Sequence, residues 1–341
     1  TLLGITFHRP LLYLIGATDA TYPYASGYMV IYLLGTVFVM TSLGLNPYIN
    51  SQGFARTGML TVLLGAVSNL ILDPIFIFLL GMGVRGAALA TILSQFFSAV
   101  WVLLFLPGKK AALKLHFRNF RPDFDCIRQI TALGTSSFVM SCTDSLVQVA
   151  CNTMLRTFGG DLYISVMTVI NSVRSIAQTP VMAISDGASP IISYNYGARN
   201  FPRVREAIRF MTQLGFGYTM LIWTLLSAFP AFFIQIFNRD AALVDAAVPS
   251  LHIYFFGFVM MAFQFSGQSV FKSLNRAKHA VFFSLLRKAF IVVPLTFLLP
   301  HVANLGVNGV FLAEPISNVI GGLACYITMR RTVMPELKAD T

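Results

Sequence analysis

Long apolar stretches recur along almost the whole chain, and they restrict the fold more than any other feature. Most of them contain the roughly 20 apolar residues that a helix needs to cross about 30 Å of hydrocarbon. We therefore predict an all-α polytopic membrane protein. The ten stretches are 1–16, 24–48, 58–80, 86–107, 129–156, 162–189, 207–237, 248–271, 279–300 and 306–329.

Composition supports this prediction, because 11% charged residues are too few to cover a soluble surface for a chain of 341 residues that is 56% hydrophobic. The first stretch is short and contains His8, Arg9 and Pro10, so it resembles the end of a span. It lacks the basic start and small-residue cleavage site of a signal peptide.

The distribution of basic residues predicts the orientation. When the loops are assigned alternately to the two sides, 17 of the 24 Lys and Arg residues fall on one side, and only Arg85, Arg156 and Arg239 fall on the other. The basic side is expected to be cytoplasmic. The net charge of +11 is spread over five loops. We therefore expect an anionic lipid bilayer, and no nucleic acid, as the partner of these charges.

An internal repeat indicates two copies of one membrane unit. YLLG at 32–35 recurs as YFFG at 254–257, and NSQGFARTG at 50–58 aligns with KSLNRAKHA at the same offset of 222. GVRGAALAT at 83–91 aligns with GVNGVFLAE at 306–314 at an offset of 223. Both copies keep the same loop charges, so the repeats are predicted to be parallel and related by an axis along the membrane normal. We therefore expect two pseudo-symmetric helical bundles.

The alignment also predicts the domain limits. The second copy begins near residue 124, so the first is shorter by roughly 100 residues, about two and a half spans. We expect a 12-span architecture without these first spans, and thus an N-terminally truncated chain. The expected domains are an incomplete N-terminal lobe (1–107), a basic cytoplasmic linker (108–126), a C-terminal lobe (127–332) and a cytoplasmic tail (333–341).

Three polar residues in the first lobe form the main candidate site. Asn69 and Asp73 are four residues apart and share a helix face. If the turn is centred on 81–86, Asp73 and Thr91 lie at roughly the same depth at 1.5 Å per residue. The three side chains are predicted to converge on one cation. A structural interpretation stays open, because Asp73 precedes Pro74 and a threonine often bonds its own helix backbone.

The sequence resembles the MATE family of multidrug and toxic compound extrusion transporters over essentially its whole length. The resemblance rests on the parallel copies, the basic linker, NLILDP at 69–74, GVRGAALAT at 83–91 and VINSVRSIAQTPVMAISDGASPIISYNYGARN at 169–200. It implies an antiporter that exports organic, often cationic, compounds in exchange for Na⁺ or H⁺ by alternating access. No cofactor other than the coupling ion is implied.

The resemblance also bears on the site. One branch of the family binds its ion in the N-terminal lobe through an Asp on the first helix, an Asn and an Asp on the fifth, and a Thr on the sixth. Asn69, Asp73 and Thr91 match the last three. Another branch uses acids of the C-terminal lobe, but the stretch 254–271 offers only Gln264 and Gln268. The sequence therefore favours the N-terminal site.

Further polar residues in the second lobe are candidates for a substrate cavity. Asp144 and Arg174 are predicted to form a buried pair, because both lie about 13 residues from the turn at 157–161. The alternative is that each faces the water-filled cavity separately, where Asp144 would attract a cationic drug. Glu314 aligns with Thr91 and is either a cavity-facing acid or a structural cap beside Pro315. The further candidates are Gln264 and Gln268.

Other classes of protein receive less support. The G-x-G-x-x-G sequence at 81–86 follows a run too long for a strand, so it is a turn rather than a dinucleotide motif. The four cysteines lack metal spacing, and no nucleophile motif or P-loop is present, so we expect no enzyme. The alternative function is a lipid-linked oligosaccharide flippase, which needs a strongly cationic cavity, whereas the spans hold acids as often as bases. We expect a monomer in a bacterial or archaeal inner membrane.

Overall fold

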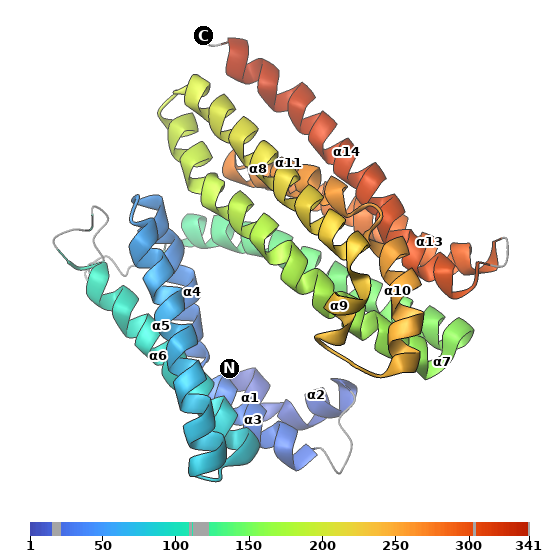
Figure 1. The fold of residues 1–341 in the computed structure, drawn as a ribbon. Coiled ribbons are helices and arrows are strands. Elements are labelled where there is room, and N and C mark those ends of the chain that lie inside the picture. The colour runs from blue at the N-terminus through green and yellow to red at the C-terminus, as the bar shows by residue number, and fades with distance from the viewer. Residues whose placement is uncertain (16–21, 109–110, 112–122, 303–304, 340–341) are drawn as a thin grey trace. The chain divides into compact units, whose positions relative to one another are not determined.

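The computed structural model describes residues 1–15, 22–108, 111, 123–302 and 305–339, and within them every regular element is a helix. The chain divides into two compact units, Thr1–Pro122 and Asp123–Thr341. The division falls within the stretch 108–126, most of which lies outside the described residues. Each unit is described by itself below (Figure 1).

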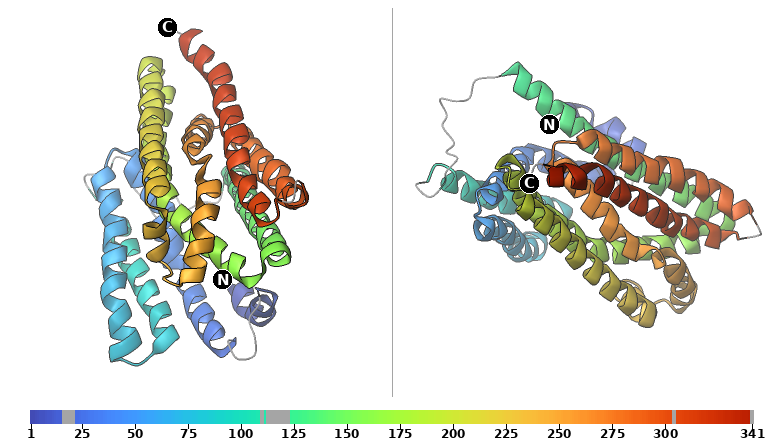
Figure 2. Two further views of the ribbon diagram at one scale, coloured as in Figure 1. Left: turned by 45° about the vertical axis from the view of Figure 1, so that its right-hand side comes forward. Right: turned by 90° about the horizontal axis from the view of Figure 1, so that it is seen from above.

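The first unit is a helical bundle built around α6 (Gly83–Phe105). This helix packs against α3 (Tyr22–Leu34), α4 (Thr36–Ser51) and α5 (Ala55–Pro74), and α5 continues as the π-helical turn η1 (Ile75–Leu79). Two short helices, α1 (Leu2–Thr6) and α2 (His8–Ile15), precede the bundle. The views of Figure 2 show α4, α5 and α6 side by side.

The second unit begins with the longest described helix, α7 (Phe124–Gly197). This helix bends at Gly160, because the φ angle of Gly160 is 68° and therefore non-helical. Its two arms run side by side, and Asn171 Nδ2 on one donates to Gln148 Oε1 on the other at 3.1 Å. The remaining elements are α8 (Phe201–Ala228), α9 (Pro230–Gln235), α10 (Ala241–Phe255), η3 (Phe258–Met260), α11 (Met261–Ser273), α12 (Ala277–Leu285), η4 (Leu286–Val292), α13 (Val293–Leu298), η5 (Leu299–His301) and α14 (Val307–Ala339).

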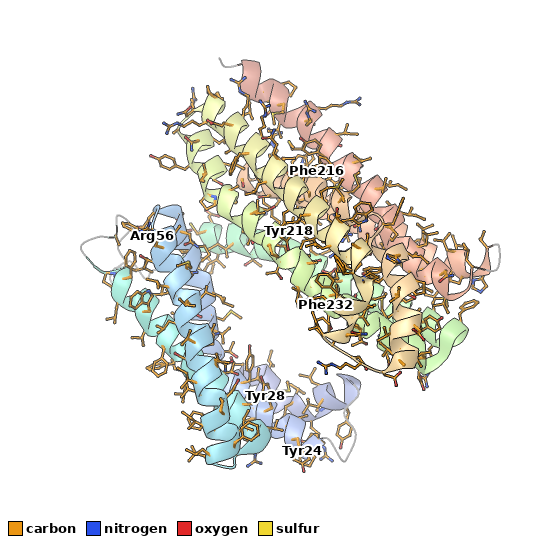
Figure 3. The ribbon with its side chains drawn as sticks, in the orientation of Figure 1. Tyr24, Tyr28, Arg56, Phe216, Tyr218 and Phe232 are labelled. Atoms are coloured by element: carbon orange, nitrogen blue, oxygen red, sulfur yellow. The ribbon has the colours of Figure 1, made fainter. Side chains whose placement is uncertain are left out.

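Two apolar clusters form the core of the second unit. One lies around Leu155, Ile170 and Phe311, and the other around Phe271 and Met329, and all five side chains are fully buried. Large apolar side chains also cover the outside of both units. Tyr24 and Phe232, labelled in Figure 3, are 66% and 62% exposed. An exterior of this kind suits contact with lipid rather than water.

Four described helices are long and apolar enough to cross a membrane, namely Ala55–Leu79, Gly83–Phe105, Ala277–His301 and Val307–Leu337. Two bent helix pairs also reach this length and apolarity if each is taken as one span, α3 with α4 at 52° and α10 with η3 and α11 at 43°. These six correspond to predicted stretches. The other four stretches form α1 and α2, the arms of α7, and α8 with α9, which are not among the described helices with that length and apolarity.

Both bends occur at the repeated motif YLLG/YFFG. At each bend the glycine lies against another helix of its own unit. A Cβ on Gly35 would collide with the side chain of Ile92, and a Cβ on Gly257 would lie 2.5 Å from the backbone oxygen of Pro315. Ile92 and Pro315 are themselves equivalent at the offset of 223. The repeat in the sequence therefore marks one packing contact that occurs in each unit.

A hydrogen bond is repeated in the same way. Asn46 Nδ2 donates to the carbonyl oxygen of Gly58 at 3.3 Å, and Gln268 Nε2 donates to that of Ala280 at 3.3 Å. Both pairs are related by the offset of 222. The two units are thus helical bundles that repeat the same internal contacts, and the predicted all-α fold class is confirmed.

Gly257→Ala is expected to lower the melting temperature of the purified protein. The added methyl group meets the backbone of Pro315, and overpacking of this kind costs about 1–3 kcal/mol. Gly217→Ala is the matched control, because nothing lies within 4 Å of a Cβ there and the residue is inside α8. Alanine favours a helix over glycine by up to ~1 kcal/mol, so the control should melt at an equal or higher temperature. Equal melting temperatures for the two variants would contradict the close packing at Gly257.

Candidate functional site

The predicted cation-site residues of the first unit lie on two packed helices. On α5, Asn69 Nδ2 donates to Asp73 Oδ1 at 3.4 Å, and both residues are half-buried. The four-residue spacing thus places them on one face, as expected. On α6, Thr91 Oγ1 donates to the carbonyl oxygen of Ala87 in its own helix at 2.9 Å. The hydroxyl oxygen of Thr91 can still accept a bond or coordinate a cation.

Asn69 and Thr91 line one cavity of about 230 Å³ between the helices of the first unit. Asp73 is not among its lining residues and joins the cavity only through its hydrogen bond with Asn69. Carboxylate, amide and hydroxyl oxygens are the ligands that hard cations take, so the three side chains fit Na⁺ chemically. Their role stays a prediction. The other polar lining residues, which the sequence did not single out, are Ser42, Asn46, Thr61, Ser94, Gln95 and Ser98.

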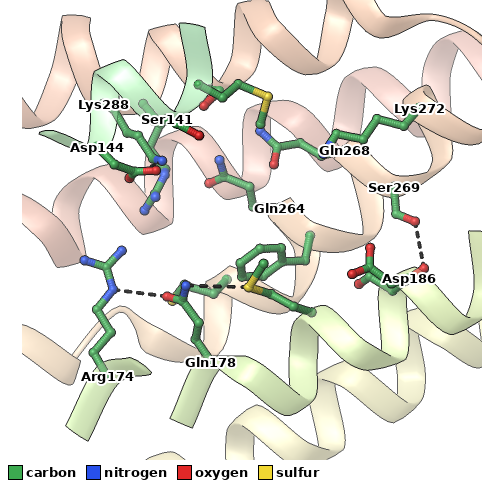
Figure 4. Close-up of a pocket in the computed structure, with 17 residues that line it drawn as sticks. Ser141, Asp144, Arg174, Gln178, Asp186, Gln264, Gln268, Ser269, Lys272 and Lys288 are labelled. Carbon is green, nitrogen blue, oxygen red and sulfur yellow. Dashed lines mark hydrogen bonds and ion pairs between the residues drawn. The ribbon is translucent and has the colours of Figure 1, made fainter. Parts of the chain in front are cut away.

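The second unit contains a larger cavity of about 270 Å³, lined by α7, α11, α12 and η4. Four predicted candidates, Asp144, Arg174, Gln264 and Gln268, line it together. In Figure 4, Gln264 lies in the middle of the lining side chains. The other polar lining residues are Ser141, Gln178, Ser185, Asp186, Lys272, Ser269, Ser284, Arg287 and Lys288.

Glu314 is buried beside this cavity and is bonded to two arginines. Its Oε1 atom lies 2.7 Å from Arg174 Nη2 and 3.0 Å from Arg287 Nη1, and the residue is only 4% exposed. Arg287 Nη1 also donates to Asn318 Oδ1 at 2.5 Å, and Arg174 Nη1 donates to the hydroxyl of Tyr254 at 2.6 Å. One carboxylate thus connects α7, η4 and α14.

The predicted ion pair between Asp144 and Arg174 is wrong, because each residue pairs with a different partner. Arg174 pairs with Glu314, whereas Asp144 pairs with Lys288 and keeps 61% of its side chain exposed. Asp144 and Arg174 do lie at a similar depth on the two arms of α7, because the nearby residues Gln148 and Asn171 are hydrogen-bonded across these arms. Depth does not fix the direction in which a side chain leaves its helix. Glu314 on α14 and Lys288 on η4, both later in the chain, are the partners instead.

Glu314→Gln is expected to destabilise the protein strongly, because it leaves the buried Arg287 and the half-buried Arg174 without their shared anion. Breaking a buried pair costs about 3–5 kcal/mol. Glu336→Gln is the control, since its pair with Arg276 at 2.5 Å is partly exposed and exposed pairs contribute about 0–1 kcal/mol. Thermal unfolding in detergent should show a large decrease for the first variant and little change for the second. Similar small decreases for both would contradict the buried network.

Comparisons with known proteins identify the family of the chain. The MatE family model matches residues 1–75 and 136–298, one match in each unit. The chain is 26% identical to the FAD transporter of Shewanella oneidensis, across 99% of this chain and 75% of that protein. It is 22% identical to the multidrug export protein MepA of Staphylococcus aureus, across 96% and 71%.

A solved structure gives the same result for the fold. A crystal structure of MATE in the bent conformation superposes with a TM-score of 0.92 at 21% identity, covering 99% of this chain and 75% of that one. The named relatives are transporters, and the apolar helices mark an integral membrane protein. The chain belongs to the MatE family of membrane transporters.

Proposed function

We propose that the protein is a secondary active antiporter that exports small organic molecules in exchange for Na⁺ or H⁺ by alternating access. The observation that carries the proposal is the half-buried carboxylate of Asp73, bonded to Asn69 within one of the most apolar helices of the chain. An acid inside a span is costly and usually serves ion movement. The names of the two relatives, a multidrug export protein and an FAD transporter, support small organic substrates.

In this mechanism Asn69, Asp73 and Thr91 take up the cation. Exchange requires that the ion and the substrate stabilise different conformations of the transporter, because a ligand shifts an equilibrium only through its differential affinity. A carboxylate serves either ion, since it can coordinate Na⁺ or accept a proton. The proposal includes no other cofactor, no enzymatic step and no nucleic acid. It places the protein as a monomer in a bacterial or archaeal inner membrane.

A lipid-linked oligosaccharide flippase is the second candidate. The supporting observation is the lining of the second cavity, where four basic side chains outnumber the two acidic ones, Asp144 and Asp186. The sequence argument that acids are as frequent as bases within the spans therefore does not describe this cavity. A flippase would carry a lipid-linked substrate, whereas the proposed antiporter carries small organic molecules. The two functions thus differ in the kind of substrate.

Asp73→Asn is expected to lower ion-driven flux about tenfold or more, a loss within the usual range of coupling energies. The assay uses vesicles that contain the protein, an imposed Na⁺ or pH gradient, and ethidium and FAD as separate substrates. Asp245→Asn is the matched control, because this residue is exposed on α10. Gradient-driven flux that is equal in wild type and Asp73→Asn would remove the first-unit site from the mechanism.

A further inference from the structure

Unpartnered polar atoms are concentrated at the cavities. Among the described residues, three buried side-chain N or O atoms have no hydrogen-bond partner, namely Asn46 Oδ1, Gln264 Oε1 and Arg287 Nε. The last two line the cavity of about 270 Å³ in the second unit, and both residues are only 5% exposed. A buried polar atom without a partner costs about 1–3 kcal/mol, and more for a charged group. Both residues line one cavity, but the two unpartnered atoms are themselves buried, so each side chain must rotate to present its atom to a ligand there.

The charge of the lining indicates the class of this ligand. Arg174 and Arg287 share one carboxylate oxygen of Glu314, so one negative charge faces two guanidinium groups. Lys288 is paired with Asp144, whereas Lys272 has no ion pair with any described residue. Counting Glu314, the site holds four basic and three acidic groups, and the excess is positive. Such a cavity favours an anion and opposes a cation.

We propose that the second-unit cavity binds an organic molecule through an anionic group, such as a phosphate, sulfonate or carboxylate. When the two side chains rotate toward the cavity, Arg287 Nε donates to the anion and Gln264 Oε1 accepts from a neighbouring donor of the same molecule. Lys272 adds positive charge without direct contact. Guanidinium groups suit anions because their N–H donors are planar and permanently charged. The inference rests on the proposed function only in treating the bound molecule as the transported substrate.

The apolar part of the lining fits the remainder of such a molecule. Met140, Met182, Met261 and Phe265 line the same cavity. Methionine side chains are flexible and polarizable, so they adapt to ligands of different shape. A purely structural role for Arg287 explains its bonds to Glu314 and Asn318. It does not explain why Arg287 Nε and Gln264 Oε1, in two residues that line one cavity, are both left without a hydrogen-bond partner.

The direct test is the binding of riboflavin 5′-phosphate and riboflavin, two fluorescent probes that differ by one phosphate. The protein is placed in phosphatidylcholine nanodiscs without any gradient, so a failure of ion-coupled transport does not affect the result. The phosphate form should bind about tenfold more tightly or better, equivalent to ~1.4 kcal/mol. Equal affinities, or no binding of either flavin, would overturn the proposal.

Two variants with exposed side chains assign the binding to the cavity. Lys272→Gln removes a positive charge and should weaken binding of the phosphate form severalfold, whereas Asp144→Asn releases Lys288 and should strengthen it. Lys278→Gln removes the same charge from an exposed position of α12 outside the lining and should change nothing. Identical affinities in the three variants would show that the phosphate binds elsewhere and would overturn the assignment.

Phosphatidylglycerol in the nanodiscs separates the two sources of such an anion. If this lipid competes with riboflavin 5′-phosphate, the anion site also accepts a lipid headgroup, and the flippase candidate gains support. If binding is unchanged, the site takes a soluble organic anion. Both results keep the anion site and decide what occupies it.

Discussion

The ion network around Glu314 is the interaction on which the second unit most depends. A single carboxylate oxygen holds Arg174 from α7 and Arg287 from η4, while Tyr254 accepts a further bond from Arg174 and Asn318 accepts one from Arg287. Charges in an apolar, buried setting are tolerated only when they are paired and bonded in this way. The network therefore fixes three helices at one point, and the cavity of about 270 Å³ lies directly beside that point.

The internal repeat shows how the two units diverged from a common plan. At the offsets of 222 and 223, Arg287 and Glu314 of the second unit correspond to Gly65 and Thr91 of the first. A Cβ on Gly65 would lie 2.6 Å from Ser98 Oγ, so α5 and α6 approach too closely there for a larger residue. The first unit thus keeps a small cavity lined by neutral polar side chains. In the second unit, the positions equivalent to Gly65 and Thr91 hold the charged residues Arg287 and Glu314.

The sequence predicted the parts of the structure that follow from regular periodicity. The apolar stretches of α5, α6 and α14 predicted helices long enough to cross a membrane, because the thickness of the bilayer dictates the length of such a helix. The repeat predicted two related units. It did not predict the bends at Gly35 and Gly257, since the need for glycine arises from the approach of another helix. Such contacts depend on packing and have no local signal.

The site was less predictable than the fold. The spacing of Asn69 and Asp73 gave their shared face, but not the position of Asp73 outside the cavity lining. Depth along α7 gave the level of Arg174 but not its partner, because the rotation of one helix against another is set by the whole bundle. Arg287 and Lys288 are bases within the predicted stretch 279–300. Their meeting at one cavity requires the fold.

The account is tested most directly by measuring the coupling between Arg174 and Glu314. A double-mutant cycle uses Arg174→Gln, Glu314→Gln and both together, with the free energy of unfolding as the readout. Residues in direct contact typically show a coupling of about 0.5–3 kcal/mol. The account predicts a coupling in the upper half of that range for this pair, and near-additivity for Arg174→Gln combined with Asp144→Asn. Additive effects for Arg174 and Glu314, together with strong coupling between Arg174 and Asp144, would contradict it.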